Sequence, residues 1–168
     1  EFDANFSVNA DRRPQARAAI IDGTFQTAPC PACGIDFRLE PEMVYLDVGR
    51  GQWILVKPAR ELEQWKDLEN IADVIFEANY GPKAIAPARA IGARLTIRVT
   101  FGWPALREKI VLQELKLDET AVELLKLALL RGDARPPIAD DIELRLLDKV
   151  GDTLRLGWIS AGSGEIHE

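Results

Sequence analysis

Two cysteines separated by two residues are the part of this sequence whose types and spacing could do chemistry. They lie in the run Cys30-Pro31-Ala32-Cys33-Gly34, and the 168 residues contain no other cysteine. A turn of this spacing can direct both thiolates at one tetrahedral metal ion, with backbone N–H groups toward the sulfurs. Gly34 permits the backbone dihedrals that the turn requires. The pattern favours a structural Zn²⁺ knuckle with Cys30 and Cys33 as ligands.

Three other interpretations of the pair remain open: a thiol–disulfide redox couple, a structural disulfide, and two inert cysteines. A thioredoxin-like pair normally begins a helix, whose dipole lowers the thiol pKa. Here the segment from Ile35 to Leu39 alternates apolar and charged residues and predicts a strand. The metal knuckle is therefore our leading interpretation.

The knuckle supplies half of a zinc site. Structural zinc takes four ligands, and the only histidine, His167, lies in a tail from Ala161 onward that we expect to be disordered. We expect the two further ligands outside this chain segment. Because the chain begins at Glu1 and not at Met, a second cysteine pair upstream is the preferred source. A symmetry-related chain is the alternative, and an empty knuckle is the third.

Strands must position the cysteines. Phe25 to Ala28 and Ile35 to Leu39 predict a hairpin with the pair at its tip. A second hairpin is predicted from Met43 to Val56, with its turn at Gly49-Arg50-Gly51.

The remaining elements follow from periodicity, turn residues and helix caps. The expected strands are Phe6 to Asn9, Leu95 to Phe101, Ile142 to Leu146 and Leu154 to Trp158. The expected helices are Arg12 to Asp22, Glu61 to Ala78, Ala84 to Ala90, Pro104 to Leu115, and Glu119 to Leu130 with Asp118 as its cap.

These elements predict an α+β fold. We expect antiparallel strands around the zinc-knuckle hairpin in the first half, followed by a helix-rich lobe with additional strands. The expected division is residues 1–81, a zinc-ribbon-containing region, and residues 82–168, an α+β C-terminal lobe. The likeliest point of division falls between Gly81 and Ala93, where the composition changes.

The stretch from Phe2 to Val56 resembles the CpXC-domain proteins of bacteria. The matching residues are Ser7-Val8-Asn9, Gly23-Thr24-Phe25, Cys30-Pro31-Ala32-Cys33-Gly34 and the segment from Pro41 to Asp47. The resemblance extends, through less specific matches, to Val99-Thr100-Phe101, Leu106-Arg107-Glu108-Lys109 and the segment from Leu117 to Leu130. It implies a four-cysteine zinc ribbon whose first Cys-Pro-x-Cys-Gly precedes the point where this chain starts. It implies no activity.

Charge and hydropathy exclude two classes of partner. The net charge of -6 would repel nucleic acid. The longest apolar run, Leu124 to Leu130, is too short for a bilayer and contains Lys126. No secretory signal is visible, so we expect a cytoplasmic protein without membrane insertion.

No catalytic or cofactor-binding constellation emerges. His167 is poorly placed for a triad, and no phosphate-binding loop occurs. The acidic residues and the tryptophans fit surface and packing roles; they are Glu61, Glu63, Asp67, Glu69, Asp140, Asp141, Trp53, Trp65, Trp103 and Trp158. The helix from Ala121 to Leu130 carries too many leucines for one stripe, so it is either deeply buried or an interface.

These observations predict a non-enzymatic, zinc-ribbon-like module that acts by binding a protein partner or by assembling with itself. Two alternatives stay open. One is a thiol–disulfide redox protein that uses the Cys30/Cys33 pair. The other is a homodimer bridged by a shared metal ion.

Overall fold

The computed structural model describes residues 4–132, 141–162 and 164–167. Over these residues the fold is mixed α and β, with five α-helices and three sheets. The chain forms two compact units, residues 1–102 and residues 103–168. The sequence-based division after residue 81 stays a prediction about domains.

The first unit is built on a four-stranded sheet, with strand order β1-β4-β5-β6. Its elements are β1 (Ser7–Asn9), α1 (Pro14–Ile21), β2 (Thr27–Pro29), β3 (Asp36–Arg38), β4 (Met43–Asp47), β5 (Gln52–Lys57), the 3-10 helix η1 (Ala59–Gln64), α2 (Trp65–Tyr80), α3 (Ala86–Gly92) and β6 (Thr96–Phe101). Strands β2 and β3 form a separate two-stranded sheet.

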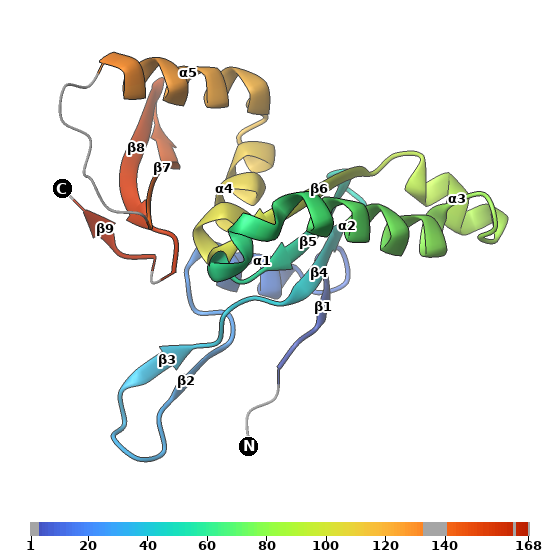
Figure 1. The fold of residues 1–168 in the computed structure, drawn as a ribbon, viewed down its shortest axis with the longest axis horizontal. Coiled ribbons are helices and arrows are strands. Elements are labelled where there is room, and N and C mark those ends of the chain that lie inside the picture. The colour runs from blue at the N-terminus through green and yellow to red at the C-terminus, as the bar shows by residue number, and fades with distance from the viewer. Residues whose placement is uncertain (1–3, 133–140, 163, 168) are drawn as a thin grey trace. The chain divides into compact units, whose positions relative to one another are not determined.

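The four-stranded sheet is mixed, which corrects the expected set of antiparallel strands. β4 and β5 pair antiparallel as the predicted hairpin, whereas β1 pairs with β4 and β5 pairs with β6 in parallel. Parallel neighbours need a long crossover connection. Here α1 and the β2–β3 hairpin lie in the first crossover, and α2 and α3 lie in the second (Figure 1).

Side chains of β5 are buried on both faces of this sheet. Trp53 and Leu55 pack against Ala72 and Phe76 of α2, and the rings of Trp53 and Phe76 meet edge to face with centroids 5.6 Å apart. Ile54, which alternates to the opposite face, is also buried. A continuous apolar strand of this kind fits a sheet covered on both sides.

The second unit combines two helices with an antiparallel sheet, order β7-β8-β9. Its elements are α4 (Gly102–Glu114), α5 (Glu119–Gly132), β7 (Ile142–Val150), β8 (Thr153–Ser160) and β9 (Ile166–His167). Asp118 caps α5 as expected, because its Oδ1 accepts from the Ala121 N–H at 2.7 Å. Val111, Leu112, Val122 and Leu146 form the unit's core cluster.

Strand β9 corrects the prediction of a disordered tail after Ala161. Ile166 and His167 pair with Ile159 and Trp158 of β8. The sequence could not predict β9, because a strand of two residues is too short to show alternation. No helix in the described part of the chain is long and apolar enough to cross a membrane.

Candidate metal centre

The two cysteines lie in the turn that joins β2 to β3. The strands pair Thr27 with Arg38, Ala28 with Phe37 and Pro29 with Asp36. Both strands are short, and together they form a narrow hairpin that projects from the four-stranded sheet (Figure 1). This position is the one that the sequence predicts for the pair.

Two backbone hydrogen bonds define the turn. The Cys30 N–H donates to the Ile35 carbonyl at 2.8 Å, and the Gly34 N–H donates to the Cys30 carbonyl at 2.8 Å. Gly34 has a φ of 73°, in the left-handed region. A side chain at Gly34 would meet no atom within 4 Å, so the requirement for glycine is one of dihedral angle and not of space.

Two backbone amides act on the sulfur of Cys30. Hydrogen bonds from the N–H groups of Ala32 and Cys33, and then from the Cys33 thiol, lower the pKa of Cys30 and outweigh a small effect of burial. Cys30 is half-buried, Cys33 is exposed, and neither is in a disulfide. The turn therefore brings the two sulfurs together and favours a thiolate at Cys30 without a helix terminus.

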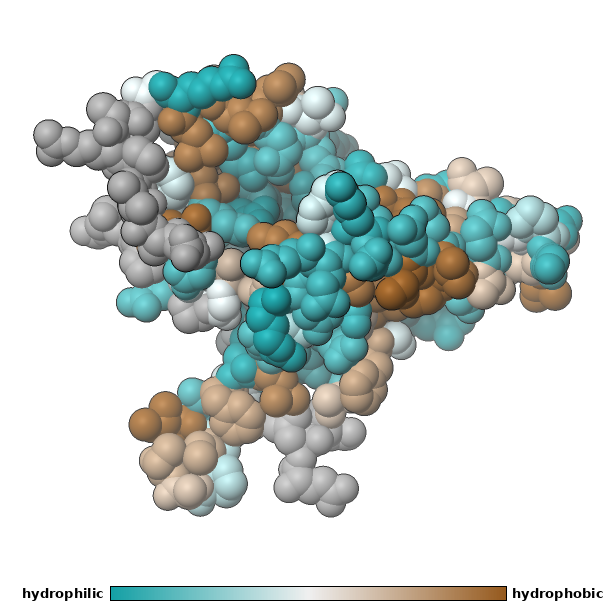
Figure 2. Space-filling view, in the orientation of Figure 1, coloured by the Kyte–Doolittle hydropathy of each residue, from teal (hydrophilic) through white to brown (hydrophobic). Residues whose placement is uncertain are grey.

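The tip of this hairpin is apolar. Ile35 is 70% exposed and Phe37 is also exposed. Figure 2 shows brown and tan side chains gathered on the hairpin, away from the teal surface of the sheet unit.

The other acidic residues singled out in the sequence are exposed or have partners of their own where the structure describes them. Glu63, Asp67 and Glu69 are exposed on η1 and α2. The Oε2 atom of Glu61 lies 3.8 Å from Nζ of Lys57. Asp141 accepts from the Ser160 hydroxyl at 2.7 Å, and Asp140 lies outside the described residues.

The tryptophans divide between packing and surface. Trp53 and Trp103 are buried, Trp158 is half-buried, and Trp65 is exposed on α2.

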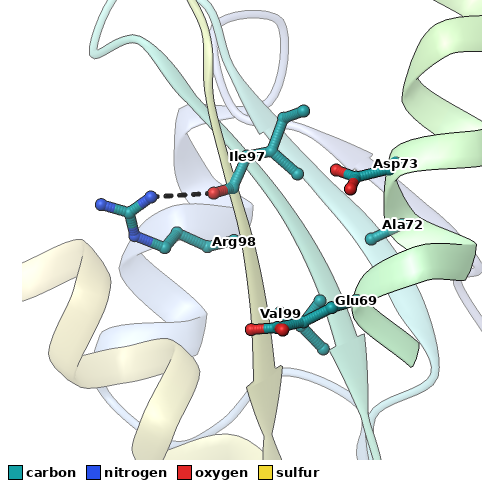
Figure 3. Close-up of a pocket in the computed structure, with 6 residues that line it drawn as sticks. All are labelled: Glu69, Ala72, Asp73, Ile97, Arg98 and Val99. Atoms are coloured by element: carbon teal, nitrogen blue, oxygen red, sulfur yellow. Dashed lines mark hydrogen bonds between the residues drawn. The ribbon is translucent and has the colours of Figure 1, made fainter. Parts of the chain in front are cut away.

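A groove lies between α2 and β6 (Figure 3). Its volume is about 410 Å³. Ile97 and Val99 point toward α2, where Glu69 and Asp73 stand at the rim (Figure 3). Arg98 points to the other face of the strand, and its Nη1 donates to the Ile97 carbonyl at 2.9 Å. The charged groups that line the groove therefore do not converge on one point.

The structure contains two buried ionic clusters that the sequence analysis did not predict. In the first unit Asp47 is fully buried and accepts from Arg17 Nε at 3.0 Å and from the Tyr45 hydroxyl at 3.3 Å. Burial is the main reason that the pKa of Tyr45 is raised, so its hydroxyl remains a donor. Asp47 comes at the end of an alternating strand, and only its place on the same face as Tyr45 could have signalled this role.

The second cluster is centred on Glu108 of α4. Its carboxylate accepts from Lys126 Nζ at 3.1 and 3.2 Å, from Arg145 Nη1 at 2.8 Å, and from the Leu146 N–H at 2.7 Å. Glu108 is fully buried and Lys126 is 5% exposed. The lysine that interrupts the leucine run therefore points inward, and the leucines around it are displaced to other faces.

Family comparison places these features in context. Residues 1–126, well over half of the chain, match the model of the CpXC protein family. The chain belongs to the CpXC protein family. No curated protein and no solved structure matches it. The CpXC match spans the whole first unit, α4 and part of α5, and it ends at Lys126 before β7 begins.

The CpXC turn fits part of a zinc site. Hydrogen bonds from two amides and from the Cys33 thiol lower the pKa of Cys30 and favour its thiolate form, which is the form that binds zinc. Among the residues that the structure describes, no group of three or more His, Cys, Asp or Glu side chains could hold a metal ion. Cys30 and Cys33 would therefore supply two ligands, and the site needs others.

Proposed function

We propose that this CpXC protein is a non-enzymatic, zinc-ribbon-like module that acts by binding another protein. Cys30 and Cys33 supply two ligands of a structural Zn²⁺ ion, and two further ligands come from outside this chain segment. The observation that carries the proposal is the Cys30–Gly34 turn, where backbone amides lower the pKa of Cys30 beside a second thiol. Thiolates, not thiols, bind zinc, so this environment favours metal over an inert pair.

The surroundings of the turn support a role in binding. Ile35 and Phe37 expose apolar surface on the same short hairpin. A second metal-bearing segment, or a partner protein, would bury that surface while completing the ligand set. A structural ion would then stiffen a contact surface instead of activating a substrate.

Zinc content tests this proposal. Elemental analysis compares the 168-residue chain with a chain extended upstream of Glu1. We expect one zinc per chain in the extended protein, a lower content in the 168-residue chain, and loss of zinc from both after Cys33→Ser. Ala32→Ser is the matched control, because it changes the same turn and leaves both thiols in place. Absence of zinc from both unsubstituted proteins would contradict the proposal.

A metal-bridged homodimer is distinguished in the same samples. If two CpXC turns share one ion, the 168-residue chain itself holds one zinc per two chains. A chelator then converts the dimer to monomers, which light scattering detects directly.

A redox couple is the second candidate function, because the same lowered pKa favours thiol–disulfide exchange. Oxidation would join the two sulfurs and pass two electrons and two protons to a disulfide oxidant such as oxidised glutathione. Reversible disulfide formation in glutathione buffers by the metal-free 168-residue chain would support it. A pair that holds zinc and resists glutathione would argue against it.

A further inference from the structure

Helix α5 presents a leucine-rich face to solvent. Val122 and Lys126 turn inward and are 4% and 5% exposed, whereas Leu124, Leu127 and Leu130 are 61%, 50% and 40% exposed. Figure 2 shows brown hydrophobic side chains among hydrophilic ones over this helix. A monomer rarely exposes so many leucines on one helix.

The inner face of α5 is anchored at Val122 and Lys126. Val122 belongs to the cluster with Val111, Leu112 and Leu146, and Lys126 is held by Glu108 at 3.1 Å. This packing fixes the rotation of the helix about its axis. The exposed leucines therefore belong to a fixed, preformed surface and are not left over from loose packing.

The leucines of the exposed face are arranged symmetrically about Leu127. Leu124 lies three residues before it and Leu130 three residues after it, while Glu123 lies four before and Arg131 four after. In an antiparallel pair with Leu127 on the two-fold axis, each Glu123 reaches the level of the other chain's Arg131. Leucines meet leucines across the centre. This is the self-complementary order that an isologous contact requires.

We infer that α5 is a homodimer contact, in which two copies of this chain pair their α5 helices antiparallel about Leu127. Leu124, Leu127 and Leu130 form its apolar centre, and Glu123 and Arg131 form its charged ends. Glu123 is partly exposed and already contacts Lys126 Nζ at 2.9 Å, so its carboxylate would be shared with the incoming guanidinium. The inference does not depend on metal at the Cys30–Cys33 turn.

The size of the surface sets the strength of the contact. A 14-residue helix is about 21 Å long. One such helix buries less than the roughly 800 Å² per partner of a standard stable interface. We therefore expect reversible association with a dissociation constant on the order of 10⁻⁵ to 10⁻⁴ M.

Sedimentation equilibrium on the 168-residue chain tests the inference, over concentrations from about ten-fold below to ten-fold above that range. The average mass should rise from that of a monomer toward that of a dimer. Leu127→Glu places two carboxylates at the two-fold axis and should weaken association at least about tenfold. Val74→Glu is the matched control, because Val74 is another exposed apolar residue, on α2; it should leave association unchanged.

A cross-linking experiment provides independent evidence if Leu127→Glu alters the fold. The two-fold axis puts Leu127 opposite itself, so Leu127→Cys should form a covalent dimer on mild oxidation. Val74→Cys should not, and peptide mapping separates this bond from any at Cys30 or Cys33. A monomer at every concentration would overturn the inference, and so would a dimer that Leu127→Glu leaves intact. A dimer lost on chelation but retained in Leu127→Glu would also overturn it, and would instead support metal bridging.

Discussion

At the scale of single residues, the environment of Cys30 is made by main chain and not by charged side chains. The amides of Ala32 and Cys33 point at its sulfur because Gly34 lets the turn close in the left-handed region. Such a site is encoded by backbone conformation. Sequence spacing alone can therefore predict it, even though no basic residue marks the place.

The pH dependence of alkylation should reveal this environment. Because the pKa of Cys30 is lowered in the folded protein, its thiolate should persist to lower pH than in the urea-denatured chain. Iodoacetamide labelling of Cys30, followed by mass spectrometry in the presence of a chelator, measures this shift. In Cys33→Ser the pKa should rise part of the way back, because the two amides remain. Identical pH profiles for the folded and denatured chains would contradict the interpretation.

At the scale of elements, α4, α5 and β7 are joined through one carboxylate. Burial raises the pKa of Glu108, but Arg145, the Leu146 amide and Lys126 outweigh that effect, and the net pKa is lowered. The charged form is thus stabilised by the fold. Its contribution is fully present above the pKa of an unfolded glutamate, and it is lost as pH falls through the lower, folded pKa.

Removing this charge should destabilise the second unit strongly. Glu108→Gln leaves Lys126 and Arg145 with only the partly exposed Glu123 and Glu143 as counter-charges, and breaking a buried pair in this way costs about 3 to 5 kcal/mol. Thermal or urea unfolding at neutral pH measures the loss, which should shrink toward acid pH. Lys109→Gln is the matched control on the same helix. It removes ion pairs with Glu119 and Glu123, which are both partly exposed, and should cost about 1 kcal/mol or less.

Periodicity predicted nearly all elements, because each strand and helix buries a regular set of positions. The β4–β5 hairpin and α2 follow from residues such as Trp53 and Phe76. The direction of β6 could not be predicted, because alternation of Ile97 and Val99 is the same in a parallel and an antiparallel pair. The burial of Lys126 could not be predicted either, because its partner Glu108 lies eighteen residues away. The local pattern shows only a leucine run that a lysine interrupts.

At the scale of the whole molecule, the chain carries two units with separate cores. Trp53 and Phe76 anchor the first core, and Val111 and Leu146 belong to the second. The cysteine turn belongs to the first unit and the leucine face of α5 to the second. The proposed zinc site and the proposed α5 contact therefore lie in different units and can be tested separately.

Hydrogen exchange should show this separation. Glu108→Gln should increase amide exchange in β7 and β8, because Glu108 holds the Leu146 N–H. Amides of β4 and β5 should keep the protection of the unsubstituted protein, since their core contains no part of the Glu108 cluster. Equal loss of protection in both sheets would show instead that the units unfold as one cooperative body.

The cysteine hairpin lies inside the connection between two strands that must find each other. Val8 pairs with Tyr45, and the hairpin between them is closed at its base, where the Leu39 N–H donates to the Gln26 carbonyl at 3.2 Å. Once formed, it shortens the loop that β1 and β4 must close by about a third, which saves about 0.4 kcal/mol of closure entropy. An ion that fixed the hairpin early would act on the rate of sheet assembly as well as on the finished surface.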